Sequence, residues 1–212
     1  MLTLYYAPGA ASLAVHWMLI EIGAPFETVA LDFEKNDQKR PDFLKINPVG
    51  MVPTLVDDGE VYTEAAAILT WLAERHPEAG FSVAPDDPRR RLYLQHMFHL
   101  ANTLQPAFRL WFYSDEGAGP ENAEATRKYA REKIEAVWTR YDAAFADGRT
   151  FLLGDDMTAA DFLLTMLTRW SRNMPKPATD WPHLGAYVAR MRKREALREV
   201  HRREGLTDWI NV

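Results

Sequence analysis

The chain has 212 residues, 47 % of them hydrophobic and 26 % charged, which is enough for one large domain or two small ones. Its formal net charge of −5 argues against a nucleic-acid partner, because phosphate binding needs a basic surface. The absence of cysteine excludes disulfides, thiolate metal sites and a thiol nucleophile carried by the protein. No apolar run approaches the ~18 residues of a membrane span, and the sequence begins in a strand pattern rather than a signal peptide, so we expect a cytoplasmic protein without a membrane partner.

The first elements along the chain alternate between strands and helices. Residues 1–6 are typical of a buried strand, and the apolar residues from Ser12 are spaced as in a helix that ends at Gly23. A second strand is predicted over 26–33, followed by a short helix or turn that leads into a loop closed by Gly50. Two strands around an Asp-Gly hairpin turn then precede an amphipathic helix over 64–76.

This order, β-α-β, a connecting helix and β-β-α, predicts a thioredoxin-like α/β domain over residues 1–77. A βαβ unit implies a parallel strand pair, and the later hairpin adds an antiparallel edge. Residues 78–88 are rich in turn formers and have no period, which favours a linker. Residues 89–212 show only helical periodicity and predict an all-α domain, with helices near 89–113, 122–146, 158–173 and 182–204.

The spacing of Thr158 and Asp161 ahead of an apolar run predicts a capping box at the start of the third of these helices. In such a box, the side chains of the two residues satisfy backbone N–H groups at the helix start. We expect this pair to have a structural role.

Motifs spread along the chain resemble those of the cytosolic glutathione transferases. They are NPVGMVPTL (47–55), YTEAAAILTWLAE (62–74), MTAADFLL (157–164) and WPHLGAYVARMRKR (181–194). The segment YYAPGAASL (5–13) is further similar to the bacterial beta class, except that Ala11 stands where that class has a cysteine. The resemblance implies the glutathione-transferase fold, a homodimer, and attack of a bound glutathione thiolate on a small apolar electrophile, in conjugation or isomerisation.

Thiol activation is expected at the turn between Tyr6 and Ser12. A free thiol titrates near ~8.5, so an enzyme that uses glutathione must stabilise its thiolate. The N-terminus of a helix that begins at Ser12 supplies N–H groups and a positive dipole end for this purpose. We expect the hydroxyl of Ser12 or Tyr6 to add a hydrogen bond to the sulfur, which makes these two residues the candidate catalytic groups.

The resemblance also implies which residues bind the rest of glutathione, a tripeptide with two carboxylates and one ammonium group. The backbone of Val52, before a cis proline, pairs with the cysteinyl part, and Glu64 reaches the ammonium group. Glu64 alternatively only complements the dipole of the following helix, and Lys35, matched to the glycyl carboxylate, is alternatively a solvated surface lysine. The expected glutathione contacts are Ala11, Lys35, Met51, Val52, Pro53, Glu64, Ala65 and Gln105.

Several positions depart from the beta-class pattern. Besides Ala11, Ala65 stands where a small hydroxyl residue or glycine is common, Gln105 and Pro106 stand where the pattern has His and Lys, and Phe98 replaces a common Asn. The missing thiol excludes a mixed disulfide with glutathione, and a glutamine is a poor general acid or base. Conjugation or isomerisation is therefore favoured over redox chemistry. A non-catalytic protein that binds glutathione or an apolar ligand is the alternative, and an assembly module is a third possibility.

The electrophile is expected beside the sulfur, between the two domains. Residues 106–115 carry more aromatic side chains than one helix face can hold. We expect Ala10, Phe108 and Trp111 to line an apolar site there. Core packing of at least two of the aromatic side chains in this run is the alternative.

Three histidines could have functional roles, but for each of them a structural role is the simpler interpretation. His96 and His99 have the spacing of a metal pair, but no third ligand accompanies them, so we predict no metal site. His16 lies one helical turn after Ser12, where a general base is conceivable and a packed or surface histidine is more ordinary.

Overall fold

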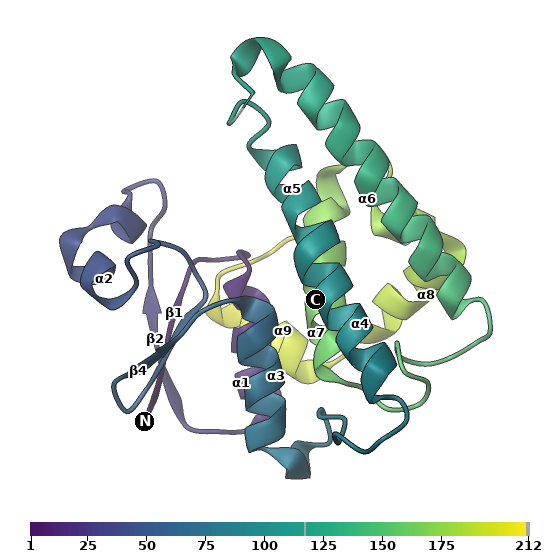
Figure 1. Ribbon diagram of the computed structural model, residues 1–212, viewed down its shortest axis with the longest axis horizontal. Coiled ribbons are helices and arrows are strands. Elements are labelled where there is room, and N and C mark those ends of the chain that lie inside the picture. The colour runs from purple at the N-terminus through teal and green to yellow at the C-terminus, as the bar shows by residue number, and fades with distance from the viewer. Residues whose placement is uncertain (117, 211–212) are drawn as a thin grey trace. The chain divides into compact units, whose positions relative to one another are not determined.

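The computed structural model describes residues 1–116 and 118–210, which group into two units (Figure 1). The first unit holds Met1–Ser82 and the C-terminal segment that begins at Arg192, and the second holds Val83–Met191. The boundary after Ser82 lies inside the segment expected to be a linker. The C-terminal segment differs from the expected division, which placed all of 89–212 in one helical domain. The reason is that its helix packs against the first helix of the chain.

Among the described residues, the sheet of the first unit has four strands in the order β2-β1-β3-β4. Strands β1 and β2 pair in parallel, while β3 pairs antiparallel with both β1 and β4. This arrangement confirms the predicted βαβ unit with its antiparallel hairpin. The strands are β1 Leu2–Tyr6, β2 Phe26–Ala30, β3 Thr54–Asp57 and β4 Glu60–Tyr62, and the helices of this unit are α1 Ser12–Ile22, α2 Pro41–Ile46, α3 Ala65–Arg75 and α9 Glu195–Arg203.

Neighbouring tyrosines on β1 show which helices cover which face of the sheet. The Tyr5 ring lies 5.5 Å from that of Phe43 in α2, and the Tyr6 ring lies 5.2 Å from that of His16 in α1. Because successive strand residues point to opposite faces, α1 and α2 lie on opposite sides of the sheet (Figure 1). Helices α3 and α9 pack beside α1, so that α1 is buried on several sides.

Within its described residues, the second unit is built from helices, apart from an isolated β-bridge between Phe151 and Gly154. Its helices are α4 Arg90–His99, α5 Gln105–Phe112, α6 Ala123–Phe145, α7 Ala159–Trp170 and α8 Pro182–Met191. A π-helical turn over Leu100–Leu104 separates α4 from α5, where one continuous helix was expected. Short 3₁₀ turns elsewhere in the chain occupy Asp37–Lys39, Pro77–Ala79, Pro120–Asn122, Ser171–Asn173 and Ala178–Asp180.

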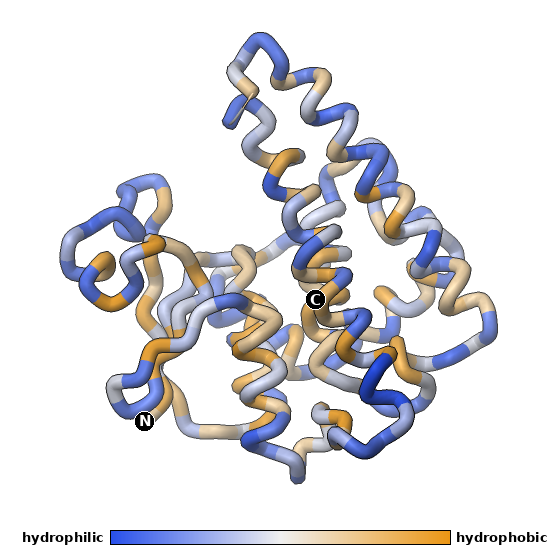
Figure 2. The backbone as a smooth tube through the Cα atoms, viewed as in Figure 1, coloured by the Kyte–Doolittle hydropathy of each residue, from blue (hydrophilic) through white to orange (hydrophobic). Residues whose placement is uncertain are grey.

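Helices α6 and α7 show two kinds of burial. In α6, hydrophilic and hydrophobic residues alternate along the helix, as Figure 2 shows, and the residues it buries recur at helical spacing. In contrast, α7 is buried at every residue from Ala159 to Arg169 and lies at the centre of its unit. None of the helices in the described part of the chain is long and apolar enough to cross a membrane.

The start of α7 has the predicted capping box. The Asp161 carboxylate accepts the N–H of Thr158 at 2.9 Å and the N–H of Leu152 at 3.0 Å. Burial raises the pKa of Asp161 to about 6, although these hydrogen bonds act in the opposite direction. The cap at the N-terminus of α7 is therefore made by a carboxylate that is itself buried in the core.

Candidate functional site

Loops that carry most of the expected glutathione contacts leave the sheet at one end. Tyr6 lies opposite Ala30, so the loops that follow β1 and β2 start side by side. Tyr5 lies opposite Thr54 and Leu55 opposite Tyr62, so the loops before β3 and after β4 reach the same end. The register of the strands therefore brings these loops together at the same end of the sheet. They are residues 7–12, 31–35, 51–53 and 63–65.

The turn from Ala7 to Ser12 is closed by the Ser12 hydroxyl. The N–H of Ala7 donates to Ser12 Oγ at 3.2 Å, and Ser12 Oγ donates to the Ala7 carbonyl oxygen at 3.2 Å. Ser12 is 0 % exposed. The hydroxyl expected to contact the sulfur is thus already paired with the Ala7 backbone, and it holds the shape of the turn.

The start of α1 leaves backbone donors open. Its N-cap residue is Ala11, whose side chain has no oxygen with which to cap the helix. For the N–H groups of Ala11 and Ser12, no acceptor lies within hydrogen-bonding range in residues 1–116 and 118–210. Two unpaired N–H groups at the positive end of a helix dipole are suited to bind an anion.

Tyr6, the second candidate catalytic residue, lies at the end of β1 on the face covered by α1. Its side chain is largely buried and its ring packs against His16. Burial, and after it the nearby Glu204, raise the pKa of Tyr6 above its ordinary value. The phenol therefore stays protonated at neutral pH and keeps the ability to donate a hydrogen bond.

The loop before β3 is held by Asn47. This buried side chain donates to the Met51 carbonyl oxygen at 3.0 Å and to Thr54 Oγ1 at 2.9 Å. The peptide between Val52 and Pro53 is cis, as the resemblance implies. Among the described residues, the backbone N–H and carbonyl of Val52 form no hydrogen bond, which leaves them available to an extended peptide.

Glu64 has an unusual backbone conformation immediately before α3. Its φ of 66° and ψ of 108° lie outside the regions that a residue with a side chain normally adopts. Such conformations cluster at functional sites, where the surrounding structure maintains them. The Glu64 side chain is exposed, and the N–H of Ala65 stands at the first position of α3 without an acceptor in the described chain.

Lys35 lies on the surface and already has a carboxylate partner. Its Nζ is 2.8 Å from an Asp32 carboxylate oxygen, which raises the pKa of Lys35 and lowers the pKa of Asp32. A ligand carboxylate at this position would compete with Asp32 for the ammonium group.

The remaining candidates are divided between the units. Ala10 lies half-buried in the turn of the first unit, while Gln105 and Trp111 are half-buried on α5 of the second. Phe108 is 0 % exposed, and its ring packs against the rings of Phe112, Trp138 and Trp170 at 5.9, 6.1 and 5.6 Å. Phe108 therefore packs in the core of the helical unit, which favours the alternative of core packing over a place on the ligand surface.

His96 and His99 are linked through a buried tyrosine. Their Nδ1 atoms lie 3.4 and 3.3 Å from the Tyr141 hydroxyl oxygen. Burial lowers the pKa of His96 to about 4 and also lowers the pKa of His99. No group of three or more His, Asp or Glu side chains suited to a metal ion occurs in the part of the chain that the structure describes.

The sequence interpretation missed Glu204, a buried carboxylate directly after α9. One of its oxygens accepts the Gly9 N–H at 2.8 Å, and the other lies 2.8 Å from His16 Nδ1. A signal existed, because Glu204 follows the buried residues Leu197 and Val200 at helical spacing and so continues an apolar stripe.

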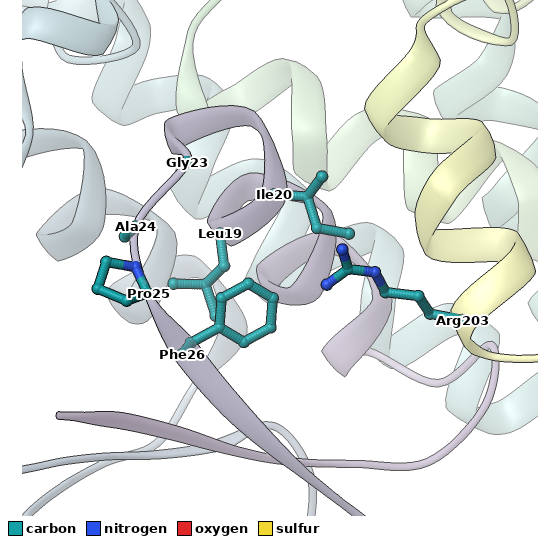
Figure 3. A pocket seen from close by; sticks show the side chains of 7 residues that line it. All are labelled: Leu19, Ile20, Gly23, Ala24, Pro25, Phe26 and Arg203. Carbon is teal, nitrogen blue, oxygen red and sulfur yellow. The ribbon is translucent and has the colours of Figure 1, made fainter.

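A cavity of about 300 Å³ lies elsewhere in the first unit. Its lining residues are Leu19, Ile20, Gly23, Ala24, Pro25, Phe26 and Arg203 (Figure 3). These residues surround the C-terminal end of α1, whose 11 residues span about 16 Å. The cavity is therefore separated from the turn at Ala7–Ser12 by the length of the helix.

Comparison with known proteins agrees with this geometry. Residues 1–74 match the N-terminal domain and residues 96–195 the C-terminal domain of glutathione S-transferases. The chain is 34 % identical over 206 residues to glutathione S-transferase GST-4.5 of Xanthomonas campestris, which covers 96 % of this chain and 98 % of that one. Two solved structures each cover 97 % of this chain and 100 % of theirs. A sphingomonad glutathione S-transferase complexed with glutathione is 32 % identical with a TM-score of 0.83, and the beta-class enzyme of Sphingomonas chungbukensis is 28 % identical with a TM-score of 0.84. The chain therefore belongs to the glutathione S-transferase family.

Proposed function

We propose that this glutathione transferase binds glutathione at the end of the sheet where the loops 7–12, 51–53 and 63–65 meet. The thiolate of the bound glutathione then attacks a small apolar electrophile. The observation that carries the proposal is the pair of unpaired N–H groups on Ala11 and Ser12, at the start of a helix in a chain of this family. The related sphingomonad enzyme was solved with glutathione bound, which supports the choice of co-substrate.

In this mechanism the backbone stabilises the thiolate. The sulfur accepts hydrogen bonds from the N–H groups of Ala11 and Ser12, and the dipole of α1 adds a positive potential. Both interactions favour the ionised thiol, so its pKa falls below that of free glutathione and its proton is released to solvent. The Ser12 hydroxyl contributes by holding Ala7 and the turn, while Tyr6 is the candidate for an additional side-chain donor.

The rest of the ligand is matched by charge and by backbone polarity. The unpaired N–H and carbonyl of Val52 pair with the cysteinyl part of glutathione. At the start of α3, the Ala65 N–H takes the γ-glutamyl carboxylate, and the exposed Glu64 carboxylate takes the ammonium group. Lys35 takes the glycyl carboxylate in place of Asp32. Met51, Pro53 and Gln105 complete the proposed contacts.

An apolar electrophile suits the aromatic surface of the helical unit. Trp111 is half-buried on α5, and Phe112 and Tyr113 are 46 % and 41 % exposed. Such surface binds apolar groups, which agrees with an addition that uses the glutathione thiolate as nucleophile. Ala10 and Trp111 are the proposed electrophile contacts.

We also propose that the protein is a cytoplasmic homodimer, as the family resemblance implies. Large apolar side chains such as Phe98, which is 62 % exposed, are consistent with a surface that a second copy covers. Sedimentation velocity is expected to give twice the mass of the chain at micromolar concentration, and a monomer would contradict this part of the proposal.

The test of thiolate stabilisation is the pH dependence of the ultraviolet thiolate absorbance of bound glutathione, in the wild type and in Ser12→Ala. We expect a thiol pKa clearly below ~8.5 in both proteins, because the variant keeps the backbone donors. A return of the thiol pKa to the free value in Ser12→Ala would show that the Ser12 hydroxyl is required, either as a direct donor or because it holds the turn.

A second measurement distinguishes an enzyme from a protein that binds glutathione without turnover. The substitutions at Ala11, Ala65 and Gln105 are the reason to consider this non-catalytic alternative. Calorimetry with glutathione is followed by assays with aryl halides, isothiocyanates, unsaturated carbonyls and peroxides. Turnover with one class supports the proposal. Binding without any turnover supports the alternative, and the absence of binding at millimolar glutathione overturns both.

A further inference from the structure

We propose that the cavity at the C-terminal end of α1 binds a small apolar carboxylate, and that Arg203 of α9 binds the negative charge of this ligand. The cavity lies at the other end of α1 from the turn that is proposed to hold the glutathione sulfur. The proposal therefore adds a second site to the first unit, and it does not depend on the function proposed above.

The cavity exists because the link between α1 and β2 is short and has small side chains. Gly23 ends α1 in a left-handed conformation with a φ of 73°, and only Ala24 and Pro25 follow before Phe26 begins β2. These link residues have no side chain long enough to fill the space between the last turn of α1 and the end of α9. A volume of about 300 Å³ stays open, which is at the lower end of the range for small-molecule sites.

The surface inside the cavity is largely hydrocarbon. Leu19 is 0 % exposed at the protein surface and forms part of the wall, to which Ile20, Pro25 and Phe26 add further apolar groups. Ile20 and Phe26 are only half-buried, so each has accessible surface that a ligand would cover. Covering this surface favours an aliphatic or aromatic ligand body over a polar one.

Arg203 is the one charged residue in this lining, and part of its guanidinium group is unused. Its Nε donates to a Glu199 carboxylate oxygen at 2.7 Å, and its side chain is 48 % exposed. Within residues 1–116 and 118–210, the two terminal nitrogens of Arg203 have no hydrogen-bond partner. Figure 3 shows the guanidinium directed from α9 toward Ile20 and Phe26, and Cζ lies 5.9 Å from the centre of the Phe26 ring. A strong donor group thus lies beside the apolar surface.

The free end of the guanidinium matches a carboxylate. Its two terminal nitrogens form a planar fork that can donate to both carboxylate oxygens at once. Glu199 does not satisfy this charge alone, because one of its oxygens also lies 2.7 Å from Arg202 Nη2. A carboxylate carries one negative charge, so it costs less to place beside apolar surface than a phosphate with nearly two.

The experiment measures the binding of hydrocinnamate to the full chain by NMR, with the backbone amides of Ile20, Ala24 and Phe26 as reporters. Hydrocinnamamide and phenylpropylamine have a similar apolar body and are neutral and positively charged, so they serve as matched probes. At millimolar hydrocinnamate we expect saturable shifts of these amides, with roughly 10-fold weaker binding of the neutral amide. The shifts should persist when S-hexylglutathione, a ligand for the proposed glutathione and electrophile sites, is added at saturation.

Variants of two neighbouring arginines test the role of the charge. Arg203→Gln is compared with Arg202→Gln, because both arginines pair with Glu199 but only Arg203 lines the cavity. Hydrocinnamate affinity should fall roughly 10-fold in Arg203→Gln and stay unchanged in Arg202→Gln. Phenylpropylamine should then bind to Arg203→Gln at least as well as hydrocinnamate, because the C-terminal end of α1 disfavours an anion. These surface ion pairs contribute little to stability, so the urea midpoints should not change.

A third variant, Ala24→Phe, fills the cavity and should remove the binding of all three probes. Equal affinity of the wild type for hydrocinnamate and hydrocinnamamide would overturn the proposal, and so would equal hydrocinnamate affinity in the two arginine variants. Loss of the Ile20 and Ala24 shifts on addition of S-hexylglutathione would place the probe in the glutathione or electrophile site instead. The absence of any saturable shift at millimolar hydrocinnamate would also overturn the proposal.

Discussion

The N-termini of α1 and α7 have the same backbone chemistry and opposite surroundings. At α7, the Asp161 carboxylate accepts the N–H groups of Thr158 and Leu152 in the core. At α1, the N-cap is Ala11, and the N–H groups of Ala11 and Ser12 have no acceptor in the described chain. The N–H of the N-cap residue is therefore paired by the protein at α7, whereas at α1 it is left open at the end of the sheet where the loops gather, and is available to an anion.

The two helices differ in the position of their hydroxyl residue by one residue. Thr158 is the N-cap residue of α7, while Ser12 is the first helical residue of α1 and stands one position too late to cap it. Its hydroxyl instead turns back to Ala7. The turn is thereby stabilised without any of the donors at the start of α1 being consumed.

Removing the cap of α7 is the largest expected disturbance. Asp161→Ala leaves two buried N–H groups without an acceptor, so the free energy of unfolding at neutral pH should fall by about 3–5 kcal/mol. Urea denaturation measures this loss. Glutathione affinity of the folded variant should not change, and a variant as stable as the wild type would contradict the structural role of the cap.

The same carboxyl group makes stability depend on pH. Since burial raises the pKa of Asp161 from 3.8 to about 6, the folded chain binds this proton more tightly than the unfolded chain. The stability it contributes is complete below pH ~4 and is lost as the pH rises through ~6. Relative to Asp161→Asn, the wild type should therefore lose about 3 kcal/mol between pH 4 and pH 7. A difference between the two proteins that is independent of pH would contradict the raised pKa.

Adding a cap to α1 should convert it toward the state of α7. In Ala11→Asp, a side-chain carboxylate at the N-cap competes with the ligand for the positive end of the helix and repels a thiolate, so glutathione affinity should fall by about 100-fold. Calorimetry measures the affinity, and urea denaturation should show unchanged or slightly higher stability. Ala136→Asp, an exposed position on α6, controls for the added charge. Unimpaired binding by Ala11→Asp would mean that the start of α1 does not contact the ligand.

Lys35 carries the smallest expected effect. Its surface ion pair with Asp32 should contribute little to stability, so Lys35→Ala should leave the urea midpoint unchanged. If Lys35 binds the glycyl carboxylate, KM for glutathione should rise about 5-fold with kcat unchanged. Lys45→Ala, another exposed lysine with an aspartate partner, is the matched control. Equal KM values in the two variants would mean that Lys35 is a solvated surface lysine that does not contact glutathione.

Much of the fold could be predicted because its signals are local. The strand positions, the Gly23 helix end and the spacing of Thr158 and Asp161 each depend on a few neighbouring residues, and each is confirmed. The second strand is shorter than the expected 26–33 and is largely exposed rather than alternately buried. The expected helix over 182–204 is instead two helices, separated at residues 192–194. No proline or glycine marks this break, so periodicity alone could not reveal it.

The details of the site depend on contacts between distant segments. The orientation of the Ser12 hydroxyl is set by the geometry of the turn, and the burial of Phe108 by the rings of three other aromatic residues. The partner of Gly9, Glu204, lies 195 positions along the chain. Motif and spacing therefore locate the active-site turn, but cannot tell which of its groups are already paired.

We predict that the start of α1 binds the thiolate, and backbone NMR tests this most directly. The amide protons of Ala11 and Ser12 should shift downfield when glutathione binds, and should titrate with the pKa of its thiol. The S-methyl derivative, which has no thiolate, should produce neither change, and the amides at the start of α7 should not respond to either ligand. If glutathione binds while the amides of Ala11 and Ser12 remain unshifted across the thiol titration, the start of α1 does not bind the thiolate.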